Sequence, residues 1–308
     1  MKRKKLQTLS PTIQEVFEDF IIAKRAIGLT EETIHTYTYH IKRISQFLSF
    51  DKPIDELTQR DIDNLIADMR DAGISSNTIN SYTRTLKSFL SYCNQKELTT
   101  VTVKLYKTQE TIKEPYTDAE LKILLKKPNL KKCDFTEYRN WVIINLLVST
   151  GCRAATIRNM LIQDVNFSSN MITYRHTKNK SVQIVPLCTE MAAILKEYLK
   201  IRGGEEKEYL FPTQYGEQIT ERSLGSSIAS YNKSRGITKT STHLFRHTFA
   251  RKYLVDCGGN AFTLQKLLGH STLDMTKHYC AIYNQDITKN FDEMCPLTQL
   301  NKRKEKKF

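Results

Sequence analysis

The chain has 308 residues, enough for two domains of ordinary size that each bury a hydrophobic core. Hydrophobic residues make up 40% of it and charged residues 26%, a composition that excludes disordered, collagen-like and membrane-spanning chains. Lys and Arg number 47 against 33 Asp and Glu, and the formal charge of +14 favours a polyanionic partner, with nucleic acid as the leading candidate.

Several other classes of protein are excluded by local patterns. No apolar run approaches the ~18 residues that a membrane span requires, and the basic start at residues 1–7 has no apolar segment behind it. We therefore expect a cytoplasmic protein without a membrane partner. The seven cysteines are scattered and never spaced Cys-x-x-Cys, which supports neither a disulfide framework nor a zinc site. Residues 1–10 and 299–308 are basic tails.

Residues 11–96 predict four amphipathic helices joined by short loops, which together make a small helical bundle. The first helix begins at a capping box in which Thr12 is followed three residues later by Glu15. Thr30 and Thr58 are the expected N-caps of the second and third helices. Apolar residues recur at helical spacing in all four segments.

The polar faces of these four helices differ in charge. The first and third carry several Asp and Glu, whereas residues 33–50 and 77–92 contain none. Because carboxylates near phosphates weaken binding, we expect the second and fourth helices to face a DNA duplex and the others to face away. The alternative is that both faces are merely solvated. The candidate DNA-contacting residues are His35, Tyr39, Lys42, Asn80, Arg84 and Lys87.

Residues 97–115 lack a long period and end at a proline, as expected of a linker, and a second domain is expected over 116–298. An apolar helix ending at Gly151 predicts the core of this domain. Two short alternating segments predict a β-hairpin with Lys178 and Lys180 at its tip. The remaining segments predict helices near 189–202 and 222–235, from 241 to about 258, up to Gly269, and as a final pair beyond it. The domain is thus mainly helical with a small antiparallel sheet.

Several residues of this domain could handle a phosphate. His243 and Arg246 share a helical face, so an imidazole and a guanidinium are expected side by side on a polar surface. A guanidinium suits two oxygens of a phosphate, and an imidazole can donate a hydrogen bond or move a proton. Metal binding by the histidines is disfavoured because Arg246 would repel a cation. Further along, His270 follows a Leu-Gly turn and Tyr279 comes nine residues later.

Together with Arg153 behind a Thr-Gly turn, these segments, in this order and at these spacings, resemble the tyrosine recombinases, the integrase family with Xer and phage-integrase branches. The resemblance covers nearly the whole chain. It implies an N-terminal four-helix core-binding domain of the SAM-like type and a C-terminal α+β catalytic domain. The family's functional positions fall on these residues: Arg153, Lys178, His243, Arg246, His270 and, as nucleophile, Tyr279.

Alternatives remain for two roles. Lys180 is a second candidate for the acid, and it is also a candidate for DNA contact. Tyr283 is a second candidate nucleophile, whereas nothing in the sequence marks Cys280 as activated. The chain also departs from the family at Thr156, where members usually have Glu or Asp three residues after the first arginine. A threonine can form hydrogen bonds but supplies no carboxylate.

The resemblance implies a site-specific recombinase that cleaves and rejoins DNA through a 3′-phosphotyrosyl intermediate, for integration, excision or resolution of a mobile or circular element. Such chemistry needs no metal, ATP or other cofactor, and the sequence has no Walker-type phosphate loop. The implied partners are DNA with inverted half-sites, a tetramer of the chain on two duplexes, and accessory DNA-bending proteins. The rival functions are a type IB topoisomerase and a DNA-binding relative without catalysis.

Overall fold

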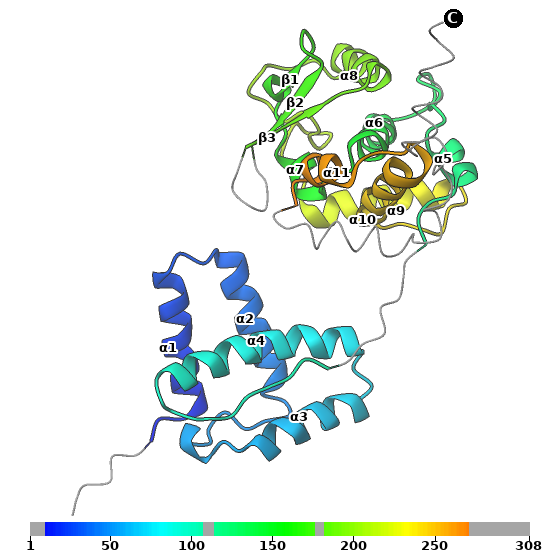
Figure 1. The fold of residues 1–308 in the computed structure, drawn as a ribbon. Helices are drawn as coiled ribbons and strands as arrows, with labels where there is room; N and C mark the ends of the chain where they lie inside the picture. The colour runs from blue at the N-terminus through cyan, green and yellow to red at the C-terminus, as the bar shows by residue number, and fades with distance from the viewer. Residues whose placement is uncertain (1–9, 107–113, 176–181, 271–308) are drawn as a thin grey trace, which may run out of the picture. The chain divides into compact units, whose positions relative to one another are not determined.

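The computed structural model describes residues 10–106, 114–175 and 182–270. The chain divides into two compact units, Met1–Thr111 and Ile112–Phe308, and each is considered by itself (Figure 1). The finer domain boundaries expected from the sequence stay predictions.

The first unit contains the four predicted helices. Their bounds are α1 Ile13–Ala26, α2 Glu31–Ile44, α3 Gln59–Asp71 and α4 Ser76–Gln95, with a 3-10 turn, η1, at Ile54–Glu56. The capping box at the start of α1 is confirmed: Thr12 Oγ1 accepts from the Glu15 amide, and the Glu15 carboxylate accepts from the Thr12 amide. Thr30 and Thr58 are N-caps, as predicted. Local sequence therefore determines where these helices begin.

The core of the first unit is formed by the apolar stripes of the four helices. Helix α4 packs against each of the other three. Phe20 and Phe89 are buried, and their rings meet edge to face at 5.6 Å. Val101 and Val103, within the expected linker, are also buried in this core, so part of that segment belongs to the packed unit. Their apolar side chains explain the difference, because burying them against α4 is favourable.

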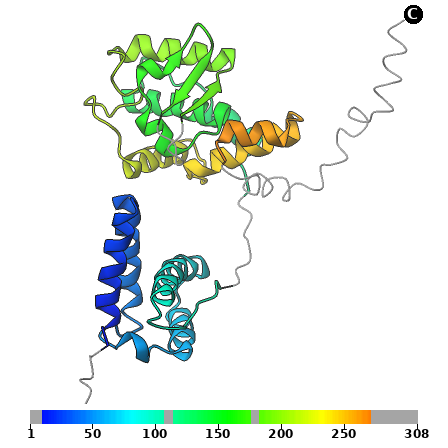
Figure 2. The ribbon, with the colours of Figure 1, turned by 60° about the vertical axis from the view of Figure 1, so that its left-hand side comes forward.

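The second unit is mainly helical. Its described helices are α5 Asp118–Leu124, α6 Phe135–Thr150, α7 Ala154–Asn159, α8 Thr189–Arg202, α9 Glu221–Ser234, α10 Thr242–Arg251 and α11 Ala261–Leu268, with a 3-10 turn, η2, at Ile162–Asp164 and a π-helical turn, η3, at Lys252–Asp256. Helices α10 and α11 lie side by side in Figures 1 and 2. The final helix pair expected from the sequence lies outside the described residues.

A three-stranded antiparallel sheet with the order β1-β2-β3 contains the predicted hairpin. Its strands are β1 Val165–Asn166, β2 Met171–Tyr174 and β3 Gln183–Pro186. The register pairs Tyr174 with Gln183 and Ile172 with Val185. Because side chains alternate along a strand, these four residues lie on one face, where three of them are buried and Gln183 is half-buried.

Helix α6 is the centre of the second unit. It packs against α8, α9 and α10, and almost every side chain of its middle turns is buried, as its uniformly apolar sequence predicts. Among the described residues, no helix combines the length and hydrophobicity that crossing a membrane would take. Helix α6 ends at Gly151, which has a left-handed backbone with a φ of 61°. A Cβ at this position would lie 2.5 Å from the Phe249 side chain, so this turn requires glycine.

Candidate active site

Arg246 lies on α10 with its guanidinium group inside the protein. Only 2% of the residue is exposed. Its Nη1 donates to the Gly151 carbonyl at 2.9 Å and its Nη2 to the Leu268 carbonyl at 2.8 Å. These carbonyls lie at the C-terminal ends of α6 and α11, where the helix dipole favours a cation. The expected exposed position of Arg246 is wrong, because these acceptors allow the charge to be buried.

Arg153 reaches the same place from another element. It is the N-cap of α7, directly after the glycine turn that ends α6, and it is half-buried. Its Nη1 donates to the Leu268 carbonyl at 3.4 Å, so one backbone oxygen accepts hydrogen bonds from both Arg153 and Arg246. Two guanidinium groups, more than 90 residues apart in the sequence, are thereby gathered at the end of α11.

His270 follows directly after α11. The helix ends at Gly269 in the left-handed conformation, with a φ of 62°, as the sequence predicts. The His270 amide donates to the Gln265 carbonyl at 3.1 Å, and Gln265 Nε2 donates back to the His270 carbonyl at 3.3 Å. The backbone of His270 is therefore attached to the last turn of α11, and only 8% of the residue is exposed.

Burial, followed by the charges of Arg246, Arg153 and His243, lowers the pKa of His270 to about 4. The imidazole is consequently neutral near pH 7, with one ring nitrogen that can donate a hydrogen bond and one that can accept. His243 is exposed on α10, and its ring meets that of His247 edge to face with 4.8 Å between centroids. The imidazoles of His243 and His270 and the guanidinium groups of Arg153 and Arg246 thus interact in one region.

The structure brings together four of the six residues assigned from the resemblance: Arg153, His243, Arg246 and His270. Lys178 and Tyr279 lie outside the described residues, as do the alternatives Lys180, Cys280 and Tyr283. Thr156 is buried just behind Arg153, and its amide donates to the Arg153 carbonyl at 3.0 Å.

The structure tests exposure for the candidate DNA-contacting residues of the first unit. His35, Tyr39 and Lys42 are exposed on α2, and Arg84 and Lys87 are exposed on α4. The expected exposure of Asn80 is wrong. It is 6% exposed, its Nδ2 donates to the Tyr106 carbonyl, and its Oδ1 accepts from the Tyr106 amide, both at 2.8 Å. The segment after α4 covers Asn80 and forms hydrogen bonds with both polar groups of its side chain.

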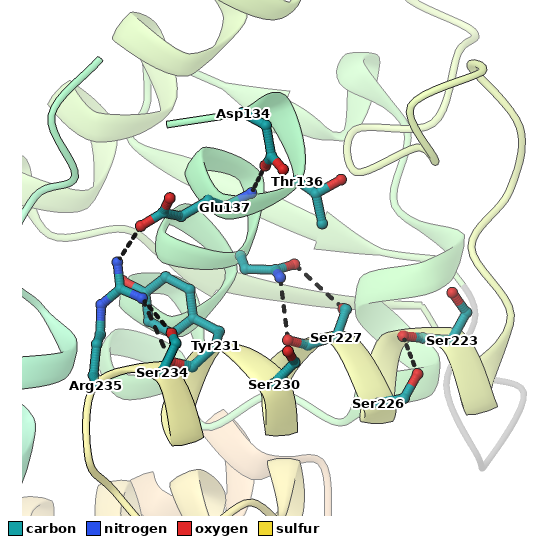
Figure 3. A pocket seen from close by; sticks show the side chains of 11 residues that line it. Asp134, Thr136, Glu137, Ser223, Ser226, Ser227, Ser230, Tyr231, Ser234 and Arg235 are labelled. Atoms are coloured by element: carbon teal, nitrogen blue, oxygen red, sulfur yellow. Dashed lines mark hydrogen bonds and ion pairs between the residues drawn. The ribbon is translucent and has the colours of Figure 1, made fainter. Parts of the chain in front are cut away.

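Within the same described ranges, no group of three His, Cys, Asp or Glu side chains could hold a metal ion. An open pocket of about 530 Å³ lies between the start of α6 and a row of serines on α9 (Figure 3). Its polar groups bind one another: Arg235 pairs with Glu137 at 2.7 Å, and Asn140 exchanges hydrogen bonds with Ser227. None of the predicted site residues lines it.

One residue beside the site was missed by the sequence analysis. Gln183, on β3, donates from its side-chain amide to two carbonyls of the last turn of α11. An isolated glutamine in a short alternating strand gives no signal of such a contact, because its partner is more than 80 residues away.

Comparison with known families identifies the class of protein. The phage integrase family matches residues 116–286, more than half of the chain, and the phage integrase N-terminal SAM-like domain matches residues 15–97. The chain therefore belongs to the phage integrase family. The predicted membership of the tyrosine recombinases and the predicted fold class are confirmed.

Individual proteins agree with this assignment. The chain is 27% identical to tyrosine recombinase XerD of Staphylococcus saprophyticus over 92% of its own length and 99% of the relative. It is also 27% identical to tyrosine recombinase XerA of Pyrococcus furiosus, over 87% of this chain and 90% of that protein.

Solved structures share the fold. The Tn1549 transposon integrase, in complex with transposon right end DNA, superposes with a TM-score of 0.74 at 22% identity, covering 87% of this chain and 94% of the integrase. A lambda integrase, as a tetramer bound to a Holliday junction, has a TM-score of 0.72 at 19% identity, covering 91% and 81% of the two chains.

Proposed function

We propose that this chain is a site-specific tyrosine recombinase in which Tyr279 attacks a DNA phosphate held by Arg153 and Arg246. The observation that carries the proposal is the convergence of both guanidinium groups on the Leu268 carbonyl, with His270 beside them. Each arginine donates to the Leu268 carbonyl, so two positive charges are held at one place, where they would attract a phosphate.

The arginines supply what phosphoryl transfer needs most. The transition state carries extra negative charge on its phosphoryl oxygens, and guanidinium groups stay protonated at any physiological pH. Fixed by backbone carbonyls, they need no reorganisation as that charge develops. No metal is required for this stabilisation, because two positive charges are already in place.

The bonds exchanged are balanced. The phenol oxygen of Tyr279 forms an ester with the phosphorus, and the bond from phosphorus to the 5′ oxygen breaks. A tyrosine has an ordinary pKa of about 10, so its proton must pass to a base, and the departing 5′ oxygen must receive one. His243 or His270 fits the first role, and Lys178 fits the second. Attack by a 5′ hydroxyl on the ester reverses the step without ATP.

The partner follows from the same chemistry. We propose double-stranded DNA with inverted half-sites, contacted in the first unit by the exposed residues of α2 and α4, and in the second by Lys180. Synapsis would use four copies of the chain on two duplexes, with accessory DNA-bending proteins as further partners. The lambda integrase tetramer on a Holliday junction supports this arrangement. A recombinase of a mobile or circular element acts on DNA in the cytoplasm, so we expect it to be nucleoid-associated.

Covalent capture of a nicked suicide duplex tests the proposal. The duplex is built on inverted half-sites found beside the gene, and the protein–DNA ester is separated by denaturing electrophoresis. We expect capture by the wild-type protein and none by Tyr279→Phe, with unchanged DNA affinity because only the nucleophilic oxygen is lost. Tyr283→Phe is the matched control and should capture normally. Capture by Tyr279→Phe that is lost in Tyr283→Phe would transfer the role to the second tyrosine.

The leaving-group acid is tested separately. Lys178→Ala should slow capture about 100-fold or more, as expected when a general acid is removed. A 5′-bridging sulfur in the duplex leaves without a proton and should restore the rate. Lys180→Ala provides the comparison, because it is two positions away in the sequence and is the second candidate for the acid. If Lys178→Ala captures the sulfur-containing duplex as slowly as the ordinary duplex, Lys178 is not the acid.

A further inference from the structure

The last turn of α11 is held by side chains from other parts of the second unit. The final carbonyls of any α-helix have no partner within the helix and must be satisfied elsewhere. Here Gln183 Nε2 donates to the Lys266 carbonyl at 2.6 Å and to the Leu267 carbonyl at 2.8 Å. The next carbonyl, that of Leu268, receives Arg246 and Arg153. Three successive carbonyls are thus satisfied from β3, α10 and the start of α7.

Gln183 fits its position closely. It lies on the face of β3 that packs inward, opposite Tyr174 on β2, and both N–H groups of a glutamine amide are accounted for by its two acceptors. A Cβ on Gly269 would lie 2.5 Å from Gln183 Oε1, so the amide occupies the space that the glycine leaves free. The glutamine and the glycine turn are therefore complementary in shape as well as in hydrogen bonding.

The turn held by Gln183 also determines the position of His270. The His270 backbone is bound in both directions to Gln265, one turn earlier in α11. A shift of this turn would therefore move the Leu268 carbonyl, which receives the arginines, together with the imidazole beside them. Since Gln183 lies on a paired strand, it connects this turn to the sheet of the unit.

We propose that Gln183 is a positioning residue of the active site, which holds the last turn of α11 so that Arg153, Arg246 and His270 keep their mutual geometry. The proposal rests on the proposed recombinase function only for its catalytic consequence. Displacement of a reacting arrangement by about 1 Å can slow a reaction about 100-fold. Gln183 acts through the turn that it holds and not as a reacting group.

The first test replaces the amide without changing the length of the side chain. We expect Gln183→Met to slow covalent capture of the nicked duplex between about 10-fold and 100-fold, with unchanged DNA affinity. Gln183→Glu removes both donors at neutral pH and places a carboxylate against carbonyls, so it should be slower still. Its rate should recover relative to Gln183→Met as the pH falls, because a protonated carboxyl can donate again.

Gln218→Met is the matched control. Gln218 is also half-buried in the second unit, and its Nε2 donates to Asn159 Oδ1 at 2.8 Å and to the Arg158 carbonyl at 3.4 Å. Its replacement removes similar hydrogen bonds at the end of another helix. We expect a similar change in melting temperature and a rate of capture per folded molecule close to that of the wild type. Equal slowing by both variants would reduce Gln183 to a general contribution to stability and overturn the proposal.

A second readout needs no DNA and therefore separates this proposal from the proposed function. The titration of His270 is followed by NMR in the full chain, and in Gln183→Met its pKa should rise from the wild-type value toward the ordinary one, because displacement of the turn exposes the imidazole to water and moves it away from the arginines. Gln218→Met should leave it unchanged. A His270 titration unaffected by Gln183→Met overturns the proposal, even if capture is slow. Absence of capture by the wild type overturns the recombinase assignment and leaves this test of Gln183 intact.

Discussion

The two units of the chain place their polar residues in opposite ways. In the first unit, Lys42 on α2 and Arg84 and Lys87 on α4 are exposed, and the buried side chains are mostly apolar. In the second, the guanidinium of Arg246 is buried and bound to backbone carbonyls from two other elements. The exposed face of a helix can be predicted from the periodicity of that helix alone. A buried charged site instead requires hydrogen-bond acceptors from segments that are distant in the sequence.

Replacing Arg246 should give the largest effect and tests whether its burial serves catalysis. We expect Arg246→Met to slow covalent capture about 100- to 1000-fold, because one fixed positive charge is lost from the transition state. Arg139→Met is the control, since Arg139 is 3% exposed and donates to the Pro212 carbonyl in the same unit. Both variants should have a lower melting temperature in thermal unfolding, because each loses buried hydrogen bonds. A comparable catalytic loss in Arg139→Met would remove the distinction between the two buried arginines.

Asn80 is buried, unlike the other candidate DNA-contacting residues of the first unit, and its replacement should mainly affect stability. Asn80→Leu removes both hydrogen bonds to Tyr106 and leaves a buried amide and carbonyl unpaired, at a cost of about 1–3 kcal/mol. Urea unfolding of the full chain measures this loss. The salt dependence of DNA binding should not change, because no charge is removed. A reduced salt dependence would return Asn80 to the DNA-contacting set.

Arg84 tests the exposed face of α4 by a smaller effect. Arg84→Gln should weaken binding to any duplex a few-fold and reduce the slope of log affinity against log salt by about 1, as expected when one phosphate contact is lost. Arg60→Gln carries the same change of charge on α3, whose acidic face is expected to point away from DNA. Fluorescence anisotropy at several salt concentrations measures both. Equal slopes for the two variants would contradict the assignment of faces.

A further expected effect concerns the stability of the second unit at low pH. The pKa of His270 is lowered to about 4 in the folded chain, whereas the ordinary value is 6.5. Between these values the unfolded chain binds a proton that the folded chain does not, so stability should fall as the pH drops from about 6.5 to about 4. His270→Gln should flatten this part of the curve. Melting temperatures measured across that range test this prediction, with His247→Gln as control. An unchanged pH dependence in His270→Gln would contradict it.

Much of this molecule follows from local rules. The helix starts at Thr12, Thr30 and Thr58, and the glycine ends at Gly151 and Gly269, lie where capping preferences put them. Those preferences depend on groups within four residues of one another, so they act before any tertiary contact forms. The β-hairpin was predicted too, because alternation along a strand is equally local.

By itself the sequence determined the family, the order of the helices and the types of residue available for phosphate chemistry. Only the tertiary structure decided that Arg246 lies inside rather than on the surface, that Asn80 is covered by the segment after α4, and that Gln183 holds the end of α11. The physical reason is the same in each case. Burying a polar side chain costs least where it finds a hydrogen-bond partner, and the partners of these three side chains are backbone groups of residues 22 to 95 positions away.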